Sequence, residues 1–120
     1  LNELSTAVQH GARVITIVAN NGRYGTIRMH QERKYPGRVS GTDLANPDFA
    51  GLARAYGAHG ETVETDAAFG PAFERALASG TAAVIDVKLD PEALTTSQTL
   101  SEVRGSAAAP RRSAGGKDPT

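Results

Sequence analysis

One segment of the chain combines residue types that could bind a metal ion and a phosphate group. It runs Asn20-Asn21-Gly22-Arg23-Tyr24-Gly25-Thr26 and directly follows an apolar run. Asparagine oxygens and backbone carbonyls are hard, neutral ligands suited to Mg²⁺, which commonly bridges protein to substrate phosphates. Glycine lets the backbone approach an anion closely, and a helix beginning at Gly25 or Thr26 would aim free N–H groups at a diphosphate. Metal and phosphate could therefore share this turn.

The same residues also fit an ordinary turn without a ligand. Asn and Gly tolerate positive φ at low cost, so Asn-Asn-Gly commonly follows a strand for conformational reasons alone. The position favours a ligand site, because ligands of open α/β sheets bind beyond the carboxyl ends of strands. These residue types do not identify the ligand, and both interpretations remain open at this point.

The elements that position the turn follow from the apolar pattern. Residues 14–19 form a β-branched run typical of a strand buried on both faces, and we expect this strand at the centre of a parallel sheet. The apolar residues of segment 1–8 recur at helical spacing, which predicts that the chain opens partway along a helix whose start is truncated. A short helix is predicted over Thr26–Lys34, followed by a loop at 35–37.

Two more helices and two more strands are predicted downstream. A helix over 47–56 has Asn46 as its N-cap and Pro47 as its first residue, and a second helix over 66–79 is capped by Thr65 or Asp66. The apolar residues expected to pack these helices on the sheet are Phe49, Leu52, Phe69, Phe73, Ala76 and Leu77. Residues 61–64 predict a strand near a sheet edge, and Ala83–Val87 an interior strand.

The alternation of helices and strands predicts the fold class α/β. Right-handed crossovers would give a partial doubly wound parallel sheet with helices on both faces. Residues 1–104 would form this domain. The small, polar and unpatterned residues 105–120 are predicted to be a disordered tail, because they cannot offset their ordering entropy by burial.

Composition excludes several classes of protein. The formal net charge is zero, which argues against a nucleic-acid-binding surface. The chain has no cysteine, so disulfide scaffolds, thiolate zinc sites and thiol nucleophiles are excluded. No apolar stretch approaches the ~20 residues that span a membrane, and no secretory leader is visible, so the expected location is cytoplasmic.

Other polar residues carry less signal. The three histidines, His10, His30 and His59, are too scattered for a local metal motif. A basic cluster surrounds Tyr35 and could contact a nucleotide phosphate or an acidic substrate, although a solvated loop face is the preferred interpretation. Its members are Arg28, Arg33, Lys34 and Arg38. Asp86, in the last strand, is expected to cap a helix or face solvent, and we assign it no chemistry.

The turn and its context resemble a known family. The run from Val18 to Arg28 is similar to the closing half of the thiamine diphosphate (ThDP)-binding motif, which begins in that family with Gly-Asp-Gly and ends in Asn-Asn. Residues 29–32, 35–38 and 46–57 resemble the acetolactate synthase-like branch. The similarity covers about Leu1 to Arg104, and the chain is identified as the C-terminal part of the ThDP-binding domain of such an enzyme.

This resemblance implies roles for the turn. Asn21 would give a side-chain oxygen and Arg23 a backbone carbonyl to Mg²⁺. Tyr24 and Gly25 would lie against the diphosphate of ThDP, and the two residues facing its reacting end would be Thr26 and Ile27. Pyruvate decarboxylase relatives carry a catalytic glutamate where Ile27 stands, which favours carboligation over simple decarboxylation. An apolar residue also occurs there in decarboxylases of aromatic 2-keto acids, and no catalytic residue is assigned.

The chain also departs from the family pattern. Gly-Asp-Gly occurs nowhere in it, and the expected place lies just before Leu1. Without this carboxylate the site loses its strongest electrostatic attraction for Mg²⁺, so cofactor affinity should be poor. The family's pyrimidine-binding domain, whose glutamate helps to activate ThDP across a subunit interface, is absent too. These 120 residues are therefore expected to be inactive alone.

Three functional hypotheses remain. In the first, the intact parent is a homo-oligomer that uses ThDP and Mg²⁺ to join or break carbon–carbon bonds of a 2-keto acid, with acetolactate synthase-like condensation preferred. In the second, the chain is a non-catalytic remnant that keeps at most an interaction surface. A Rossmann-type nucleotide-binding module ranks behind both, because no Gly-x-Gly-x-x-Gly follows residues 14–19.

Overall fold

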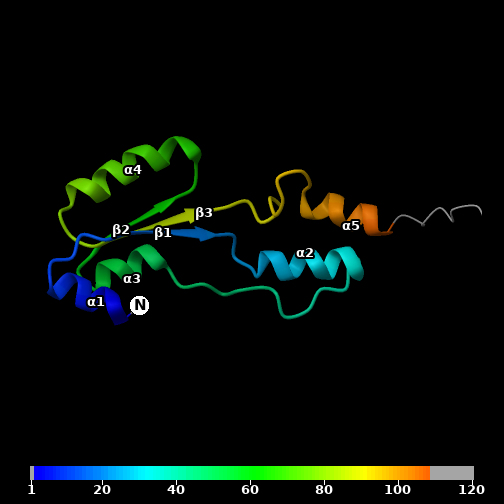
Figure 1. The fold of residues 1–120 in the computed structure, drawn as a ribbon, viewed down its shortest axis with the longest axis horizontal. Helices are drawn as coiled ribbons and strands as arrows, with labels where there is room; N and C mark the ends of the chain where they lie inside the picture. Colours follow the sequence, from blue (N-terminus) through cyan, green and yellow to red (C-terminus); the bar gives the residue numbers. More distant parts are fainter. Residues whose placement is uncertain (1, 109–120) are drawn as a thin grey trace, which may run out of the picture.

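Three parallel strands form the sheet at the centre of the structure. The computed structural model describes residues 2–108. The strands are β1 (Ile15–Asn20), β2 (His59–Val63) and β3 (Ala83–Lys88), in the spatial order β1-β3-β2 (Figure 1). Both pairs of neighbours are parallel, with Ala83 opposite Ile15 on one side and His59 on the other. This arrangement confirms the predicted α/β fold.

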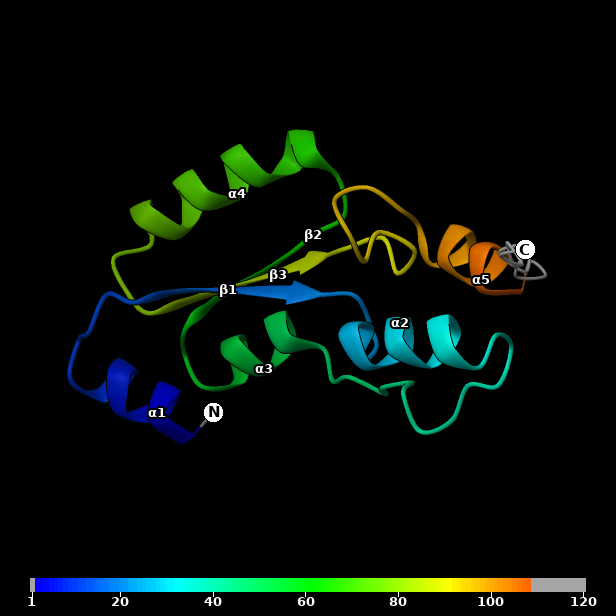
Figure 2. The same cartoon turned by 45° about the vertical axis from the view of Figure 1, so that its right-hand side comes forward.

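Helices cover both faces of the sheet. Helices α1 (Asn2–Gln9) and α3 (Phe49–Ala55) lie on one face, and α4 (Asp66–Ala78) lies on the other (Figure 2). Because side chains alternate along a strand, β3 contributes Val84 to the core beneath α1 and α3, and Ile85 to the core beneath α4. The predicted partial doubly wound sheet is therefore confirmed.

The remaining helices, α2 (Gly25–Lys34) and α5 (Leu100–Ala108), lie side by side beyond the carboxyl ends of the strands (Figures 1 and 2). Helix α2 matches the predicted helix over Thr26–Lys34. Helix α5 was not expected, because only its buried Leu100 and Val103 mark an apolar face. Residues 105–108 of the predicted tail are helical. Residues 109–120, like Leu1, lie outside the described residues.

The centre of the sheet is β3, so the prediction that β1 is central was wrong. Residues Ala83 to Asp86 of β3 are all buried, whereas Ile17 of β1 is 49% exposed. Within residues 2–108, β1 has β3 as its single strand neighbour. An apolar run indicates that both faces of a strand can be buried, but it carries no information on the number of neighbouring strands. The edge position predicted for residues 61–64 is confirmed by β2.

Small residues, rather than the largest ones, meet the sheet. Helix α4 buries Ala72 and Ala76, while Phe69 and Phe73 are half-buried against the same core. Leu77 was predicted to be buried but is 60% exposed, because it lies one position beyond Ala76 and points away from the sheet.

The start of α3 also differs from the prediction. The N-cap is Asp48, whose Oδ1 accepts a hydrogen bond of 2.8 Å from the backbone N–H of Gly51. Asn46, the predicted cap, instead points to the turn after β1. Asp and Asn cap helices about equally well, so residue type alone did not separate the two positions. On α3 the buried residues are Ala50 and Ala53, with Phe49 and Leu52 half-buried.

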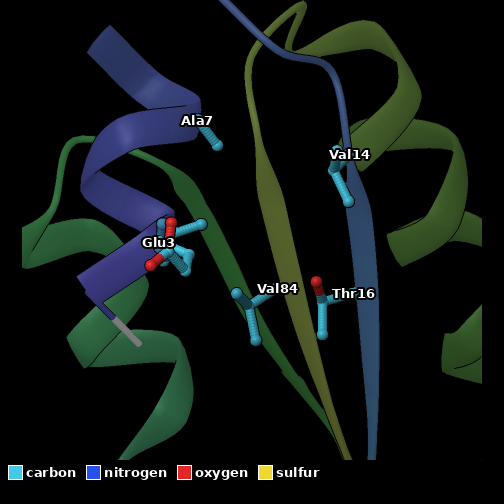
Figure 3. A pocket seen from close by; sticks show the side chains of 6 residues that line it. Glu3, Ala7, Val14, Thr16 and Val84 are labelled. Carbon is cyan, nitrogen blue, oxygen red and sulfur yellow. The ribbon is translucent and has the colours of Figure 1, made fainter. Parts of the chain in front are cut away.

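An apolar hollow of about 320 Å³ lies between α1 and the sheet (Figure 3). Its lining residues are Glu3, Leu4, Ala7, Val14, Thr16 and Val84. Thr16 lies at the beginning of β1 and Val14 directly precedes this strand, so the hollow is at the opposite end of β1 from the Asn-Asn-Gly turn. Among the helices of residues 2–108, none is long and apolar enough to cross a membrane.

Candidate functional site

The turn after β1 lies at the carboxyl end of the sheet and leads into α2 (Figure 1). β1 ends at Asn20, and α2 begins at Gly25, so every residue from Asn21 to Ile27 is in this turn or in the first helical turn. Gly22 has φ +67°, a conformation that glycine adopts without strain. The structure therefore brings the predicted site residues into one place.

Asn20 anchors the turn and is itself buried. Its Oδ1 accepts hydrogen bonds from the backbone N–H of Gly22 at 3.1 Å and from Nδ2 of Asn46 at 2.9 Å. Its Nδ2 donates to Oδ1 of Asp86 at 3.0 Å. These three bonds use both lone pairs of the amide oxygen and one of the two N–H groups, so the oxygen of Asn20 is fully committed to local structure.

Asn21 keeps an oxygen available for a ligand. Its Oδ1 accepts one hydrogen bond, from the backbone N–H of Arg23 at 3.2 Å, and an amide oxygen has two lone pairs. The backbone carbonyl of Arg23 accepts no hydrogen bond from any donor within residues 2–108. Two neutral oxygens with spare capacity thus occur two residues apart.

The amino end of α2 presents unpaired N–H groups. Its N-cap, Tyr24, makes no side-chain capping bond, and the first bond into the helix runs from the N–H of Arg28 to the carbonyl of Tyr24 at 2.9 Å. The backbone N–H groups of Gly25, Thr26 and Ile27 therefore have no partner from the preceding turn. Together with the helix dipole they form a site of partial positive charge suited to an anion.

The backbone at Gly25 is closely covered. A β-carbon on this residue would lie 2.6 Å from Nδ2 of Asn21 and 2.8 Å from Cδ2 of Leu94, which comes from the segment after β3. Both distances are far shorter than a van der Waals contact. A larger residue there would require the ends of these two side chains to shift, and the glycine backbone lies close to the side chain of Asn21.

These features fit a diphosphate and a hard divalent cation. The oxygens of Asn21 and Arg23 suit Mg²⁺, and the N–H groups that begin α2 suit phosphate oxygens. The buried Nε of Arg23 also lacks a hydrogen-bond partner in the described part of the chain. Across residues 2–108, no three His, Cys, Asp or Glu residues gather where they could hold a metal ion. The oxygens that the turn itself offers, from the Asn21 side chain and the Arg23 carbonyl, are neutral.

A second segment supports the turn from outside. The N–H of Tyr24 donates to the carbonyl of Thr42 at 2.9 Å, and the N–H of Leu44 donates to the carbonyl of Gly22 at 3.1 Å. Arg28 is buried beneath this contact, where its Nε donates to Oγ1 of Thr42 at 2.6 Å and its guanidinium pairs with Asp43. The solvated role expected for Arg28 was wrong, because this segment covers it.

The rest of the predicted basic cluster stays exposed. Lys34 and Arg38 lie 5.5 Å and 5.9 Å from the centre of the Tyr35 ring. Next to them on α2, the fully buried carboxylate of Glu32 accepts hydrogen bonds from Arg104 of α5 and from the N–H of Gly37. The hydrogen bond from Arg104 holds the pKa of Glu32 below its usual value, against the opposing effect of burial.

Asp86 is the residue that the sequence analysis missed. It was expected to cap a helix or face solvent, but it is fully buried and holds Asn20. A usable signal was present, because a carboxylate inside the most apolar strand needs a polar partner. The histidines remain apart from the turn, and His59 pairs with Glu61 at 2.7 Å.

Comparison with known proteins identifies the setting of this turn. Residues 1–87 match the family described as thiamine pyrophosphate enzyme, C-terminal TPP binding domain. The chain belongs to this family. The match confirms the identification made from the sequence, and thiamine pyrophosphate is the same compound as ThDP.

Similar proteins include an acetolactate synthase large subunit of Mycobacterium tuberculosis, 37% identical over 89 residues, or 74% of this chain and 16% of the relative. Sulfoacetaldehyde acetyltransferase of Castellaniella defragrans is 34% identical over 77 residues, 64% of this chain and 13% of that protein. In the crystal structure of benzoylformate decarboxylase from Polynucleobacter necessarius, the similar region has a TM-score of 0.64 and 32% identity, covering 74% of this chain and 17% of that one. The chain thus spans between 13% and 17% of the length of these relatives.

Proposed function

We propose that this thiamine pyrophosphate domain binds the diphosphate of ThDP together with Mg²⁺ at the turn from Asn21 to Ile27. The observation that carries the proposal is the uncapped amino end of α2 beside the spare oxygens of Asn21 and Arg23. This arrangement occurs in a chain whose family binds thiamine pyrophosphate.

Each residue has a separate part in this proposal. Asn21 Oδ1 and the Arg23 carbonyl bind Mg²⁺, while Tyr24 and the N–H groups from Gly25 onward hold the diphosphate. Thr26 and Ile27 face the reacting end. ThDP, when bound, supplies the carbanion chemistry. The turn from Asn21 to Ile27 contains no Asp or Glu, so the anionic ligand for Mg²⁺ comes from elsewhere in the parent polypeptide or from a second subunit of a homo-oligomer.

We further propose that the parent enzyme joins 2-keto acids by carboligation. The relatives named acetolactate synthase support this reaction. Ile27 also supports carboligation. Its apolar side chain, 53% exposed, cannot donate the proton that a carbanion needs before an aldehyde is released. Decarboxylation of an aromatic 2-keto acid is the second candidate, supported by the similarity to benzoylformate decarboxylase.

The proposal is tested by following backbone amide resonances of the chain while ThDP is added with and without Mg²⁺. Shifts confined to residues 22–27 and strengthened by Mg²⁺ are expected. Asn21→Ala should weaken binding in the presence of Mg²⁺ and have little effect without it, since only the metal contact is lost. Arg23→Ala should cost less, because the backbone carbonyl remains. A silent Asn21→Ala alongside an Arg23→Ala that abolishes binding would overturn the ligand assignment.

A further inference from the structure

A buried polar chain connects the central strand to the site turn. Asp86 is 0% exposed and accepts two hydrogen bonds, from Nδ2 of Asn20 at 3.0 Å and from Nζ of Lys88 at 2.6 Å. In the register of β1 and β3, Val18 is opposite Asp86 and Asn20 is opposite Lys88. Asn20, Asp86 and Lys88 therefore share one face of the sheet at its carboxyl end.

The orientation of the Asn20 amide depends on this carboxylate. A side-chain amide can adopt two orientations that differ by exchange of its oxygen and its nitrogen. In the observed orientation, the nitrogen faces the acceptor-only carboxylate of Asp86, and the oxygen faces two donors, the N–H of Gly22 and the amide of Asn46. The opposite orientation would set oxygen against carboxylate and nitrogen against donors.

We propose that Asp86 is a positioning residue for the diphosphate turn. By fixing the amide of Asn20, it holds the N–H of Gly22 in place and so sets the direction in which Asn21 and Arg23 offer their oxygens. The link to the cofactor rests on the function proposed above, whereas the link from Asp86 to the turn stands on the geometry alone. Lys88 offsets the charge of the buried carboxylate from the solvent side.

The test compares two buried carboxylates in the full 120-residue chain. Asp86→Asn keeps the size of the side chain but replaces one acceptor by a donor. Glu32→Gln makes the same change at the equally buried carboxylate of α2, which pairs with Arg104 and does not touch the turn. Both variants are compared for the side-chain amide resonances of Asn20, the backbone N–H of Gly22 and the affinity for ThDP with Mg²⁺.

Asp86→Asn is expected to shift the Asn20 and Gly22 resonances and speed their exchange with solvent, and to weaken ThDP binding by about 10-fold or more. Glu32→Gln should leave the Asn20 and Gly22 resonances unchanged. Resonances that stay in place in Asp86→Asn, or that move equally in both variants, would overturn the inference. Failure of the unmodified chain to bind ThDP would count against the proposed function, while the resonances still decide the role of Asp86.

A measurement on the unmodified chain covers the case in which Asp86→Asn does not fold. A nuclear Overhauser contact between the Asn20 Nδ2 protons and the β-protons of Asp86, with slow exchange of those amide protons, is expected. Absence of the contact in a folded chain would overturn the inference.

Discussion

Gly25 lies directly against the side chain of Asn21, so closely that a β-carbon at position 25 would be 2.6 Å from Asn21 Nδ2. The second neighbour, Leu94, closes the other side at 2.8 Å. The site turn, the start of α2 and the segment after β3 thus meet at one backbone position. A side chain cannot be added there without moving the residue proposed to bind the metal.

Gly25→Ala is therefore expected to displace Asn21 and weaken ThDP binding with Mg²⁺. The overpacking should also lower the free energy of unfolding, by about 1 kcal/mol at most, because both neighbours are the ends of flexible side chains that can move aside. Gly105→Ala is the matched control, because this helical glycine has open space around it and should gain about 0.5–1 kcal/mol. Urea unfolding and ThDP titration measure the two effects. Equal behaviour of the two variants would contradict the close packing at Gly25.

Ile85→Ala should lower the free energy of unfolding by about 2–5 kcal/mol, because Ile85 is fully buried in the central strand. Leu77→Ala removes a similar volume from an exposed position on α4 and should change the free energy of unfolding by less than about 0.5 kcal/mol. Chemical unfolding of the two variants provides the comparison. A larger loss from Leu77→Ala would show that α4 presents a different face to the sheet.

Acidification is expected to release α5 from α2 through protonation of Glu32. The pKa of Glu32 is lowered in the folded chain, chiefly by the hydrogen bond from Arg104. Its contribution to stability is therefore complete above the unfolded value of 4.5 and is lost as the pH falls through the lower folded value. Amide exchange of α5, followed from neutral to acidic pH, measures this loss.

The first matched variant is Glu32→Gln, which should reduce the acid-induced increase in α5 exchange and expose α5 already at neutral pH. The second is Glu3→Gln on exposed α1, which should leave that increase unchanged. The pKa of Glu61 is lowered chiefly by Arg75, and the pKa of Glu102 in α5 is lowered chiefly by the backbone N–H of Thr99, so the difference between the two variants gives the part that belongs to Glu32. An unchanged increase in Glu32→Gln would exclude this ion pair as its cause.

The purified chain is expected to show no turnover of pyruvate with ThDP and Mg²⁺. The turn from Asn21 to Ile27 contains no Asp or Glu, and the chain covers only 16% of an acetolactate synthase relative. ThDP would therefore be neither firmly held nor oriented for ionisation. Chromatographic detection of acetolactate or acetaldehyde from contaminant-free protein is the measurement, and product above the buffer control would contradict the expectation.

Local patterns predicted the elements of the fold, and the errors arose where tertiary neighbours decide. The buried strand at Ala83–Val87 and the edge strand near residues 61–64 were apparent from composition and alternation. The position of β1 was not, because neighbouring strands leave no mark on a short apolar run. Likewise, Leu77 has the residue type of a core position, and only the packing of Ala72 and Ala76 shows that Leu77 lies outside the contact between α4 and the sheet.

At the site, residues adjacent in sequence were predictable and distant partners were not. The ThDP-binding role of the turn from Asn21 to Ile27 remains a prediction, although its residues do come together. Asp86 and Leu94 escaped notice because each reaches the turn only through the pairing of β3 with β1. Asn46 was wrongly predicted to cap a helix. Its side-chain amide can make either a capping bond or the observed hydrogen bond to Asn20, and residue type does not distinguish the two.

The pairing of β1 with β3 also affects the way in which this chain is made. β1 is synthesised before its partner β3, which leaves the ribosome only after α2, α3, β2 and α4 have been translated. While these four elements are being made, a nascent β1 carries Ile15, Ile17 and Val18 without its partner strand β3, and such an unpaired apolar segment is open to association with other chains. We expect chaperone dependence during translation to be set by this interval, and to end when Ile85 becomes available.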